Sequence, residues 1–428
     1  MKKNHFIFSI ITLVLLVVFI TSFNYFKTTN TYIDDNINNQ TKIIKGISMN
    51  LEQTAGAGDY KTVTQSSWPT EGYKFNAELS RCENGSTLSW DDTKKAVIVS
   101  GNLSDKCYVY FDIYQPTLAE YIKSQYTGTQ GENSIYYHNS SLENGAGDNS
   151  YRYAGANPNN FVCFGSDASP CPIDNLYRII GVFGENYHGA NGKQLVKLIK
   201  YDYMTTDELG TDGDYSQTYK EWGMDSTYKG TYGDGERIGV YYWNYKATGS
   251  ATNTWSTSLL NKTNLNTNFI NNIGTTWANK IATVTWKVGG NTWANIGTKT
   301  SSVAYTNEIT NPVTTNTTDN ATTYSAKIGL MYVSDYGFAA SPDAWTLTMS
   351  SYNNTTATNN NWMYMGLYEW TISRDADRSN YAFNVSYDGF VDFSGVSFNY
   401  GVRASFNLES SVSYVSGSGS MSDPIVIN

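Results

Sequence analysis

The longest apolar segment of the chain lies at its start. Residues 4–26 carry no formal charge, and Lys2, Lys3 and Lys27 flank them. At a rise of about 1.5 Å per residue, this run can cross a hydrocarbon core of roughly 30 Å as a helix. The pattern predicts a transmembrane anchor over 1–27, with the N-terminus in the cytoplasm by the positive-inside rule. A cleaved signal peptide is the alternative, although no Ala-x-Ala-like site follows the run.

After the anchor the pattern changes from polar to alternating. Polar residues dominate 28–50, which predicts a stalk. From 51 to 114, short runs of alternating apolar and polar positions are separated by turn residues, which is typical of strands. The expected strands cover 73–77, 86–90, 95–99 and 107–111. We therefore expect a small all-β module over 51–114, which would act as a spacer.

The remaining residues, 115–428, combine helical and strand patterns. Thr117 and Glu120 form a capping-box pair, which predicts a helix that ends near Gly128. A second helix is expected over 255–270, because apolar residues recur there at roughly helical spacing. These apolar residues are Leu259, Leu260, Leu265, Phe269 and Ile270.

Strand patterns surround these two helices. The runs 176–183 and 194–200 predict a strand pair, and the broken alternation of the second run indicates that both of its faces are partly buried. Asp388 and Gly389 predict a hairpin turn. The tetrapeptide Thr-Trp-Ala-Asn occurs at 276–279 and again at 292–295, which we interpret as a strand-forming pair. The whole pattern predicts an α+β fold.

The amino-acid composition restricts the classes of molecule that the protein is expected to bind. The formal net charge is −9, and because Lys2, Lys3 and Lys27 are the only charged residues before residue 28, the remainder carries −12. That balance argues against a nucleic-acid or anionic-lipid partner, both of which require basic patches. The 35 Tyr residues have two compatible interpretations: a β-rich secreted protein, or a recognition surface in which Tyr gives contact area and Asn and Ser give hydrogen bonds.

The cysteines indicate an oxidising compartment. They fall into two local pairs, Cys82 with Cys107 and Cys163 with Cys171, and we expect each pair to form a disulfide. A zinc site is not expected, because neither pair has C-x-x-C spacing and only His138 and His188 follow the anchor.

Motifs spread over 170–428 resemble those of a family of uncharacterised bacterial surface domains. The motifs are Tyr177-Arg178-Ile179-Ile180, the segment Trp255–Phe269 with Ser258 and Leu265-Asn266, Leu330-Met331 followed by Asp335-Tyr336, Trp370 to Arg374, and Gly401-Val402-Arg403. The fold of that family is similar to the C-type lectin and formylglycine-generating-enzyme superfamily. The resemblance implies a C-type-lectin-like domain over 115–428, with two helices, antiparallel sheets and insertions. Ala404 departs from the usual Pro, and Thr371-Ile372-Ser373-Arg374 from the usual Leu-Arg-Ser.

The catalytic chemistry of that superfamily does not carry over. Formylglycine-generating enzymes use late cysteines, and none follows Cys171 here. The related sulfoxide synthases need clustered histidines. Asp375 and Asp377 are interpreted as a solvated loop paired with Arg374 and Arg378; calcium ligation and acid–base chemistry are the alternatives. We expect no catalytic residue, no metal site and no cofactor.

The sequence therefore predicts a single-pass surface protein with its C-terminal domain outside the cell membrane. Its expected function is to bind a glycan or protein through aromatic and Asn-rich loops around 340–400. The candidate contacts are Trp362, Tyr364, Trp370, Tyr381, Asn384, Tyr387, Phe398 and Tyr400. Arg403 is assigned a structural role. A non-catalytic structural role in the cell envelope is the alternative function, and an enzyme of the superfamily is the third.

Overall fold

The computed structural model describes residues 46–428, except 65–66, 70–71, 103, 185–187, 189–191, 224, 290, 313–320 and 354–359. The predicted anchor over 1–27 and most of the predicted stalk lie outside the described residues. Within them, no helix is long and apolar enough to cross a membrane. The chain divides into two compact units, one ending at Gln115 and the other covering Pro116–Asn428.

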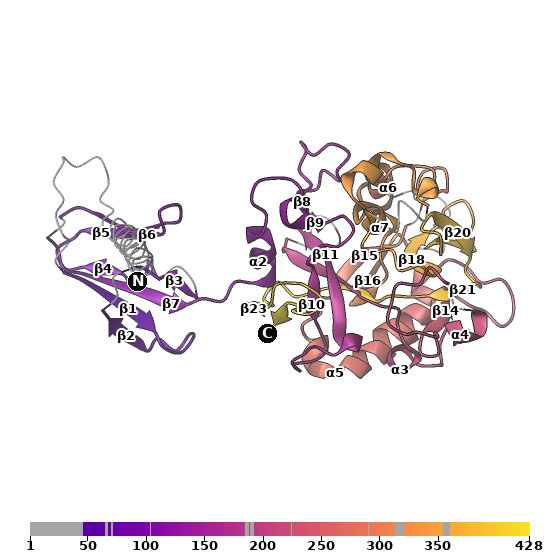
Figure 1. The fold of residues 1–428 in the computed structure, drawn as a ribbon, viewed down its shortest axis with the longest axis horizontal. Helices are drawn as coiled ribbons and strands as arrows, with labels where there is room; N and C mark the ends of the chain where they lie inside the picture. The colour runs from indigo at the N-terminus through magenta and orange to yellow at the C-terminus, as the bar shows by residue number, and fades with distance from the viewer. Residues whose placement is uncertain are drawn as a thin grey trace, which may run out of the picture. The chain divides into compact units, whose positions relative to one another are not determined.

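The first unit is an all-β module (Figure 1). Its main sheet has the order β2-β1-β7-β3, with β4 also pairing with β7, and a separate hairpin is formed by β5 and β6. The strands are β1 (Ile47–Glu52), β2 (Tyr60–Val63), β3 (Tyr73–Phe75), β4 (Arg81–Cys82), β5 (Thr87–Asp91), β6 (Ala96–Ser100) and β7 (Cys107–Ile113). The four strands expected from the sequence are present.

The first strand corrects the predicted boundary between stalk and module. β1 begins at Ile47 and runs parallel to β7, so the module includes residues that we assigned to the stalk. The signal was present in the sequence, because Ile47, Met49 and Leu51 alternate with polar residues and pack in or against the core of the module. The predicted disulfide between Cys82 and Cys107 is confirmed and joins β4 to β7.

The second unit contains two large sheets. The first has the order β17-β22-β12-β11-β9-β8, with β10 also pairing with β11. Its strands are β8 (Ile135–Tyr137), β9 (Tyr151–Tyr153), β10 (Phe161–Cys163), β11 (Leu176–Phe183), β12 (Leu195–Lys200), β17 (Ile328–Gly329) and β22 (Ser405–Asn407). Every residue of β11 and β12 is buried, which confirms the expectation that both faces of this pair are covered. The disulfide between Cys163 and Cys171 is also confirmed.

The second sheet has the order β13-β14-β21-β18-β19-β20. Its strands are β13 (Tyr215–Thr218), β14 (Gly239–Tyr242), β18 (Glu369–Arg374), β19 (Tyr381–Val385), β20 (Val391–Gly395) and β21 (Asn399–Gly401). The hairpin predicted at Asp388 and Gly389 joins β19 to β20. Two small pairs complete the unit, β15 (Val284–Lys287) with β16 (Thr323–Ala326) and β23 (Tyr414–Ser416) with β24 (Val426–Ile427).

The helices of this unit are short. They are α2 (Leu118–Ser124), α3 (Thr206–Leu209), α4 (Tyr219–Trp222), α5 (Ile270–Ala278), α6 (Ser301–Tyr305) and α7 (Val333–Phe338), with a π-helix at Leu260–Phe269, another at Thr306–Thr310, and 3₁₀ turns at Glu132–Ser134, Ile173–Asn175, Trp255–Thr257, Pro342–Thr346 and Met349–Ser351. Thr117 and Glu120 form the predicted capping box of α2, although that helix ends at Ser124. The mixed α+β class, dominated by sheets, is confirmed.

The expected helix over 255–270 has a different geometry from the predicted one. A 3₁₀ turn is followed by the π-helix, in which positions about five residues apart share a face. Leu260 and Leu265 are therefore both buried, whereas Leu259 is exposed. The chain continues into α5, which has a non-helical residue at Gly274.

The repeated tetrapeptide Thr-Trp-Ala-Asn does not form a strand pair, so that prediction is wrong. Trp277 lies at the end of α5 and packs against Phe164. Trp293 lies in a turn and packs against Phe393. The same four residues adopt two structures because their neighbours in the fold differ.

Candidate functional site

Five of the eight predicted contact residues are buried, including Tyr400, which is 6% exposed. The Trp362 and Trp370 side chains are 3% and 0% exposed, and Tyr364 and Asn384 are also buried. The Trp362 indole N–H donates to the Tyr153 carbonyl at 2.9 Å, which satisfies the only polar atom of that side chain. The prediction that these four residues contact a ligand is corrected, because their apolar surface and polar groups are already used by the fold.

Part of this correction follows from the alternating direction of the side chains along β19. Successive side chains of a strand point to opposite faces of its sheet, so Tyr381 and Asn384 cannot belong to one surface. Tyr381 packs against Phe393, whereas Asn384 donates to the Ser394 hydroxyl at 3.1 Å. The candidate residues therefore do not form one site.

Three of the predicted residues, Tyr387, Phe398 and Tyr400, do lie in one cluster. Phe398 is 56% exposed and its ring lies 6.3 Å from that of Tyr400. Tyr400 stacks on Tyr368 with ring centroids 4.9 Å apart, and Tyr368 contacts Tyr387 at 5.3 Å. Trp222, which is 38% exposed, lies 5.7 Å from the rings of both Tyr368 and Tyr400. We call this set of five rings, Trp222, Tyr368, Tyr387, Phe398 and Tyr400, the aromatic platform.

Sequence reasoning missed Trp222 and Tyr368. Trp222 ends α4 within the Tyr- and Gly-rich insertion over 201–254, which we had not connected to the C-terminal segment. The platform joins them because β14, which lies within the insertion, pairs with β21. The sequence did contain a signal for an exposed Trp222. Its neighbours are the charged residue Glu221 and the turn-forming residue Gly223, and a core position is not expected between them.

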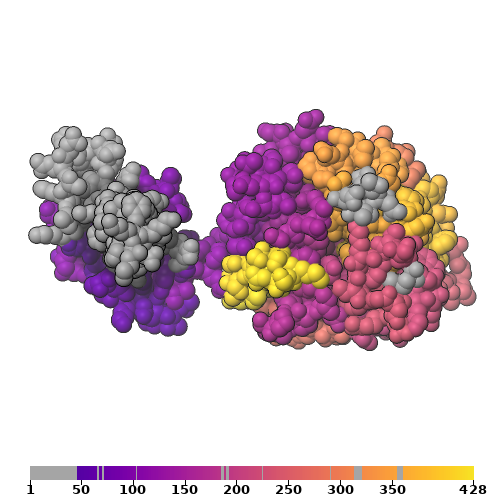
Figure 2. Space-filling view, in the orientation of Figure 1, coloured from indigo at the N-terminus to yellow at the C-terminus, as the bar shows by residue number. Residues whose placement is uncertain are grey.

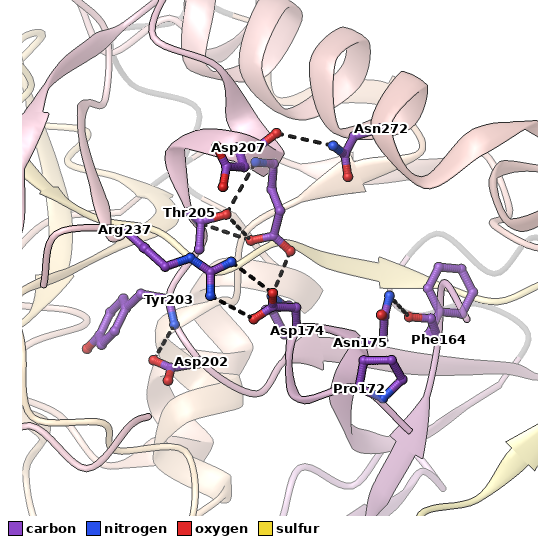
Figure 3. Close-up of polar contacts among 12 residues, drawn as sticks. Phe164, Pro172, Asp174, Asn175, Asp202, Tyr203, Thr205, Asp207, Arg237 and Asn272 are labelled. Atoms are coloured by element: carbon purple, nitrogen blue, oxygen red, sulfur yellow. Dashed lines mark hydrogen bonds and ion pairs between the residues drawn. The ribbon is translucent and has the colours of Figure 1, made fainter. Parts of the chain in front are cut away.

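Polar contacts hold the insertion on the first sheet (Figure 3). Asp174 accepts hydrogen bonds from two guanidinium nitrogens of Arg237, at 2.8 and 3.4 Å. At the other side of α3, the Asn272 amide donates to the Asp207 carbonyl at 3.1 Å. These contacts fix both ends of the segment that precedes β14.

Two buried tyrosines connect the insertion to the strand end that carries Tyr368. The Tyr203 hydroxyl donates to the Leu367 carbonyl at 3.0 Å. The Tyr219 hydroxyl donates to the Tyr368 carbonyl at 3.2 Å. Since Trp222 follows Tyr219 within the same helical turn, the positions of Trp222 and Tyr368 are coupled through the backbone as well as through their rings.

A buried ion pair lies directly behind the platform. The Glu369 carboxylate accepts hydrogen bonds from Nε and Nη2 of Arg403, both at 2.9 Å, and Nη2 also donates to the Met363 carbonyl at 2.6 Å. Against the effect of burial, the Glu369 charge raises the pKa of Arg403. These contacts give Arg403 a role in fixing β18 next to β21.

The rim of the platform is polar and acidic. The Ser394 and Tyr400 hydroxyls lie 2.9 Å apart. Asp392 lies two residues before Ser394 on β20, so its side chain leaves the same face of the sheet as Ser394, and Asp388 directly follows Tyr387. A ligand on the platform would therefore meet aromatic faces, hydroxyl groups and hydrogen-bond acceptors.

Metal-binding and catalytic arrangements were sought in the same part of the chain. Within the described ranges, no group of three or more His, Cys, Asp or Glu side chains is placed to hold a metal ion. Asp375 is buried rather than part of a solvated loop, and its carboxylate accepts the Asp377 backbone N–H at 2.9 Å. His138 and His188 are both buried, and burial lowers the pKa of each.

No protein-family model, no curated protein sequence and no solved structure matches this chain. The function is therefore argued from the geometry of the platform.

Proposed function

We propose that this chain is a bacterial surface protein of lectin-like type that binds a neutral glycan on the aromatic platform. The observation that carries the proposal is the contiguity of five rings, two of which, Trp222 and Phe398, expose a large part of their surface. The face of an aromatic ring carries a negative electrostatic potential, so it attracts the weakly positive C–H groups on the flat faces of sugars.

The rim supports a neutral rather than an anionic ligand. Asp388 and Asp392 border the rings, and residues 28–428 have a strongly negative net charge. The two carboxylates beside Ser394 and Tyr387, together with the net charge, would repel a phosphate- or carboxylate-bearing polymer. Sugar hydroxyls, in contrast, can donate to these carboxylates and to the Ser394 hydroxyl.

The location is part of the proposal. The charge-free run over residues 4–26 would anchor the protein in the cell membrane, with the two units outside. Two disulfides agree with an oxidising environment. The expected C-type-lectin-like fold remains a hypothesis that would fit this function.

The test is binding of the purified full-length chain to an array of neutral and acidic glycans. Trp222→Ala and Phe398→Ala should each weaken binding about tenfold or more, as expected for exposed aromatic contacts in an interface. Leu259→Ala is the matched control, because Leu259 is similarly exposed at 41% and makes no part of the platform. Preferential binding of acidic glycans, or equal binding by all four proteins, would contradict the proposal.

A structural role in the envelope is the second candidate. It is favoured by the burial of Trp362, Tyr364, Trp370 and Asn384, because aromatic residues were expected at the surface and instead build the core. Absence of binding across the array by a folded sample would support this alternative.

A further inference from the structure

A cavity separate from the platform lies near the start of the second unit. Its volume is about 150 Å³. Its walls come from α2, the 3₁₀ turn at Glu132–Ser134, β8, β9 and the C-terminal segment. The lining residues are Tyr121, Gln125, Asn133, Ser134, Ile135, Tyr153, Asn157, Asn159, Ser418 and Ile425.

The C-terminal segment is fixed over this region by backbone pairing. The Cys163 N–H donates to the Ile425 carbonyl at 2.9 Å, and the Phe161 N–H donates to the Gly419 carbonyl at 2.8 Å. Figure 2 shows the C-terminal segment, in yellow, lying at the surface beside the purple residues that begin the second unit. The wall that contains Ser418 and Ile425 is therefore part of the folded unit rather than a loose end.

The lining is polar but uncharged. It contains two Tyr, four side-chain amides, two Ser and two Ile, and none of its residues is Asp, Glu, Lys, Arg or His. Tyr153 is only 4% exposed, and in the part of the chain that the structure describes its hydroxyl has no hydrogen-bond partner. The side-chain amides of Asn157 and Asn159 likewise have no partner among the described residues. The Tyr153 hydroxyl is not among the fully buried polar atoms without a partner, so it is accessible from the cavity and free to pair with a bound ligand.

The walls are held in place before any ligand binds. The Tyr121 ring stacks on Tyr414 with centroids 3.6 Å apart. Asn133 and Ser134 both have left-handed backbone angles, with φ of 55° and 59°, which are uncommon for residues with a side chain. The Asn133 amide donates to the Gln125 carbonyl at 2.8 Å and ties this turn to the end of α2. A preformed site loses less conformational entropy on binding.

We propose that this cavity binds one neutral, polyhydroxylated six-membered ring, such as a single sugar residue. The volume accommodates the six-membered ring itself, because an engineered protein cavity of ~150 Å³ holds a benzene ring, and the site is partly open, so hydroxyl groups on the ring can extend towards solvent. A charged ligand would lose its hydration without gaining a counter-charge, and a wholly apolar ligand would leave the amides and the Tyr153 hydroxyl unpaired. A ring that carries several hydroxyls satisfies both conditions.

This site is independent of the proposed function, because the cavity and the aromatic platform share no residue. Sugar binding in the cavity would therefore persist when the platform is disabled. Conversely, failure of the cavity proposal would leave glycan binding on the platform untouched.

The experiment is calorimetric titration of the full-length chain with D-glucose, D-galactose, N-acetyl-D-glucosamine and D-glucuronate into the millimolar range. The expected result is binding of at least one neutral sugar, with no binding of glucuronate. Tyr153→Phe should weaken that binding about tenfold, because it removes a hydroxyl that the ligand would pair. Trp222→Ala should leave the affinity unchanged.

A matched substitution separates a binding role from a structural one. The Tyr137 hydroxyl donates to Asn149 at 3.2 Å outside the cavity, so Tyr137→Phe should leave sugar affinity unchanged. Because the Tyr153 hydroxyl has no partner in the described part of the chain, Tyr153→Phe should keep or raise the unfolding midpoint. No binding of any neutral sugar, equal affinity of Tyr153→Phe and the parent chain, or equally tight binding of glucuronate would each overturn the proposal.

Discussion

The two units satisfy their buried carboxylates in different ways. In the small module, Glu52 is buried and accepts backbone N–H groups from Gly58 and Ile113 at 3.1 and 2.9 Å. In the large unit, Glu308 likewise accepts backbone N–H groups, from Val333 and Ser334, but the buried carboxylates of Glu369 and Asp335 are paired with the buried cations Arg403 and Lys197.

The difference follows from how much interior each unit can offer. Removing two charges from water carries a desolvation penalty of several kcal/mol per ion, which is offset only where the two groups pair closely and further hydrogen bonds satisfy their remaining polar atoms. Among the residues of the module that the structure describes, the core cluster has five buried side chains, Met49, Leu51, Val97, Val109 and Phe111. A small unit instead uses backbone donors and a disulfide, because a small core rarely supplies enough stability alone. The predictions below test this contrast.

The largest effect is expected at the ion pair behind the platform. Arg403→Met leaves the Glu369 carboxylate buried without a counter-charge and should destabilise the large unit by about 3–5 kcal/mol. Urea unfolding followed by tryptophan fluorescence measures this. The double variant Arg403→Met/Glu369→Leu should recover most of the loss, because it removes both charges. If the single variant were as stable as the parent chain, the pair would not be what holds β18 beside β21.

The disulfide that closes the longer loop should contribute more to the free energy of unfolding. In the chain-entropy account, Cys82–Cys107, with a sequence separation of 25, stabilises by about 3.5 kcal/mol, and Cys163–Cys171, with a separation of 8, by about 2.5 kcal/mol. The first loss is a large fraction of the stability of a small module. Cys82→Ser/Cys107→Ser and Cys163→Ser/Cys171→Ser can be compared by hydrogen exchange of each unit. A greater loss in the large unit would reverse the contrast.

Between pH 6.5 and 5, a histidine-dependent loss of stability is expected in the large unit and not in the small module, because no histidine lies between residues 46 and 115. Burial, opposed by Asp335 and reinforced by Lys197 and Arg152, lowers the pKa of His188 from 6.5 to about 3. Below pH 6.5 the unfolded chain therefore binds a proton that the folded chain does not, so stability falls as the pH falls. At pH 5 this contribution reaches about 2 kcal/mol.

His188→Phe tests this contribution, because Phe keeps the ring contact with Phe183 and cannot be protonated. The difference in unfolding free energy between the variant and the parent chain should grow as the pH falls from 6.5 to 5. Taking the difference cancels the opposing contribution of Glu308, whose pKa burial raises to about 6. A pH-independent difference would contradict the assignment.

Local signals were enough for the parts of the fold that depend on neighbours in sequence. The capping box at Thr117, the Asp388-Gly389 turn and both disulfides involve residues close together in the chain, and the structure contains them. The two copies of Thr-Trp-Ala-Asn show where local reasoning fails, because only contacts with distant residues, Phe164 in one case and Phe393 in the other, decide their structures.

The candidate site shows the same limit. The sequence places Tyr387, Phe398 and Tyr400 close together, but it cannot tell which of the surrounding aromatic residues are buried. Trp370, predicted as a contact, is buried and donates its indole N–H to the Tyr241 carbonyl at 2.9 Å. Trp222, which was not predicted, reaches the same cluster only because β14 pairs with β21. Recognition surfaces and cores use the same aromatic residues, so the distinction requires the fold.

The smallest effect on stability is expected where the two units are alike, at their exposed apolar side chains. Phe398→Ser in the large unit and Leu79→Ser in the module remove side chains that are 56% and 39% exposed. Each should change the unfolding free energy by no more than about 0.5 kcal/mol, because surface substitutions away from structural features have little effect. Only Phe398→Ser should also reduce glycan binding. A loss of more than about 1 kcal/mol for Phe398→Ser would mean that its ring supports the fold. That outcome would contradict the platform, because the proposal requires the Phe398 ring to be exposed and to have no stabilising role.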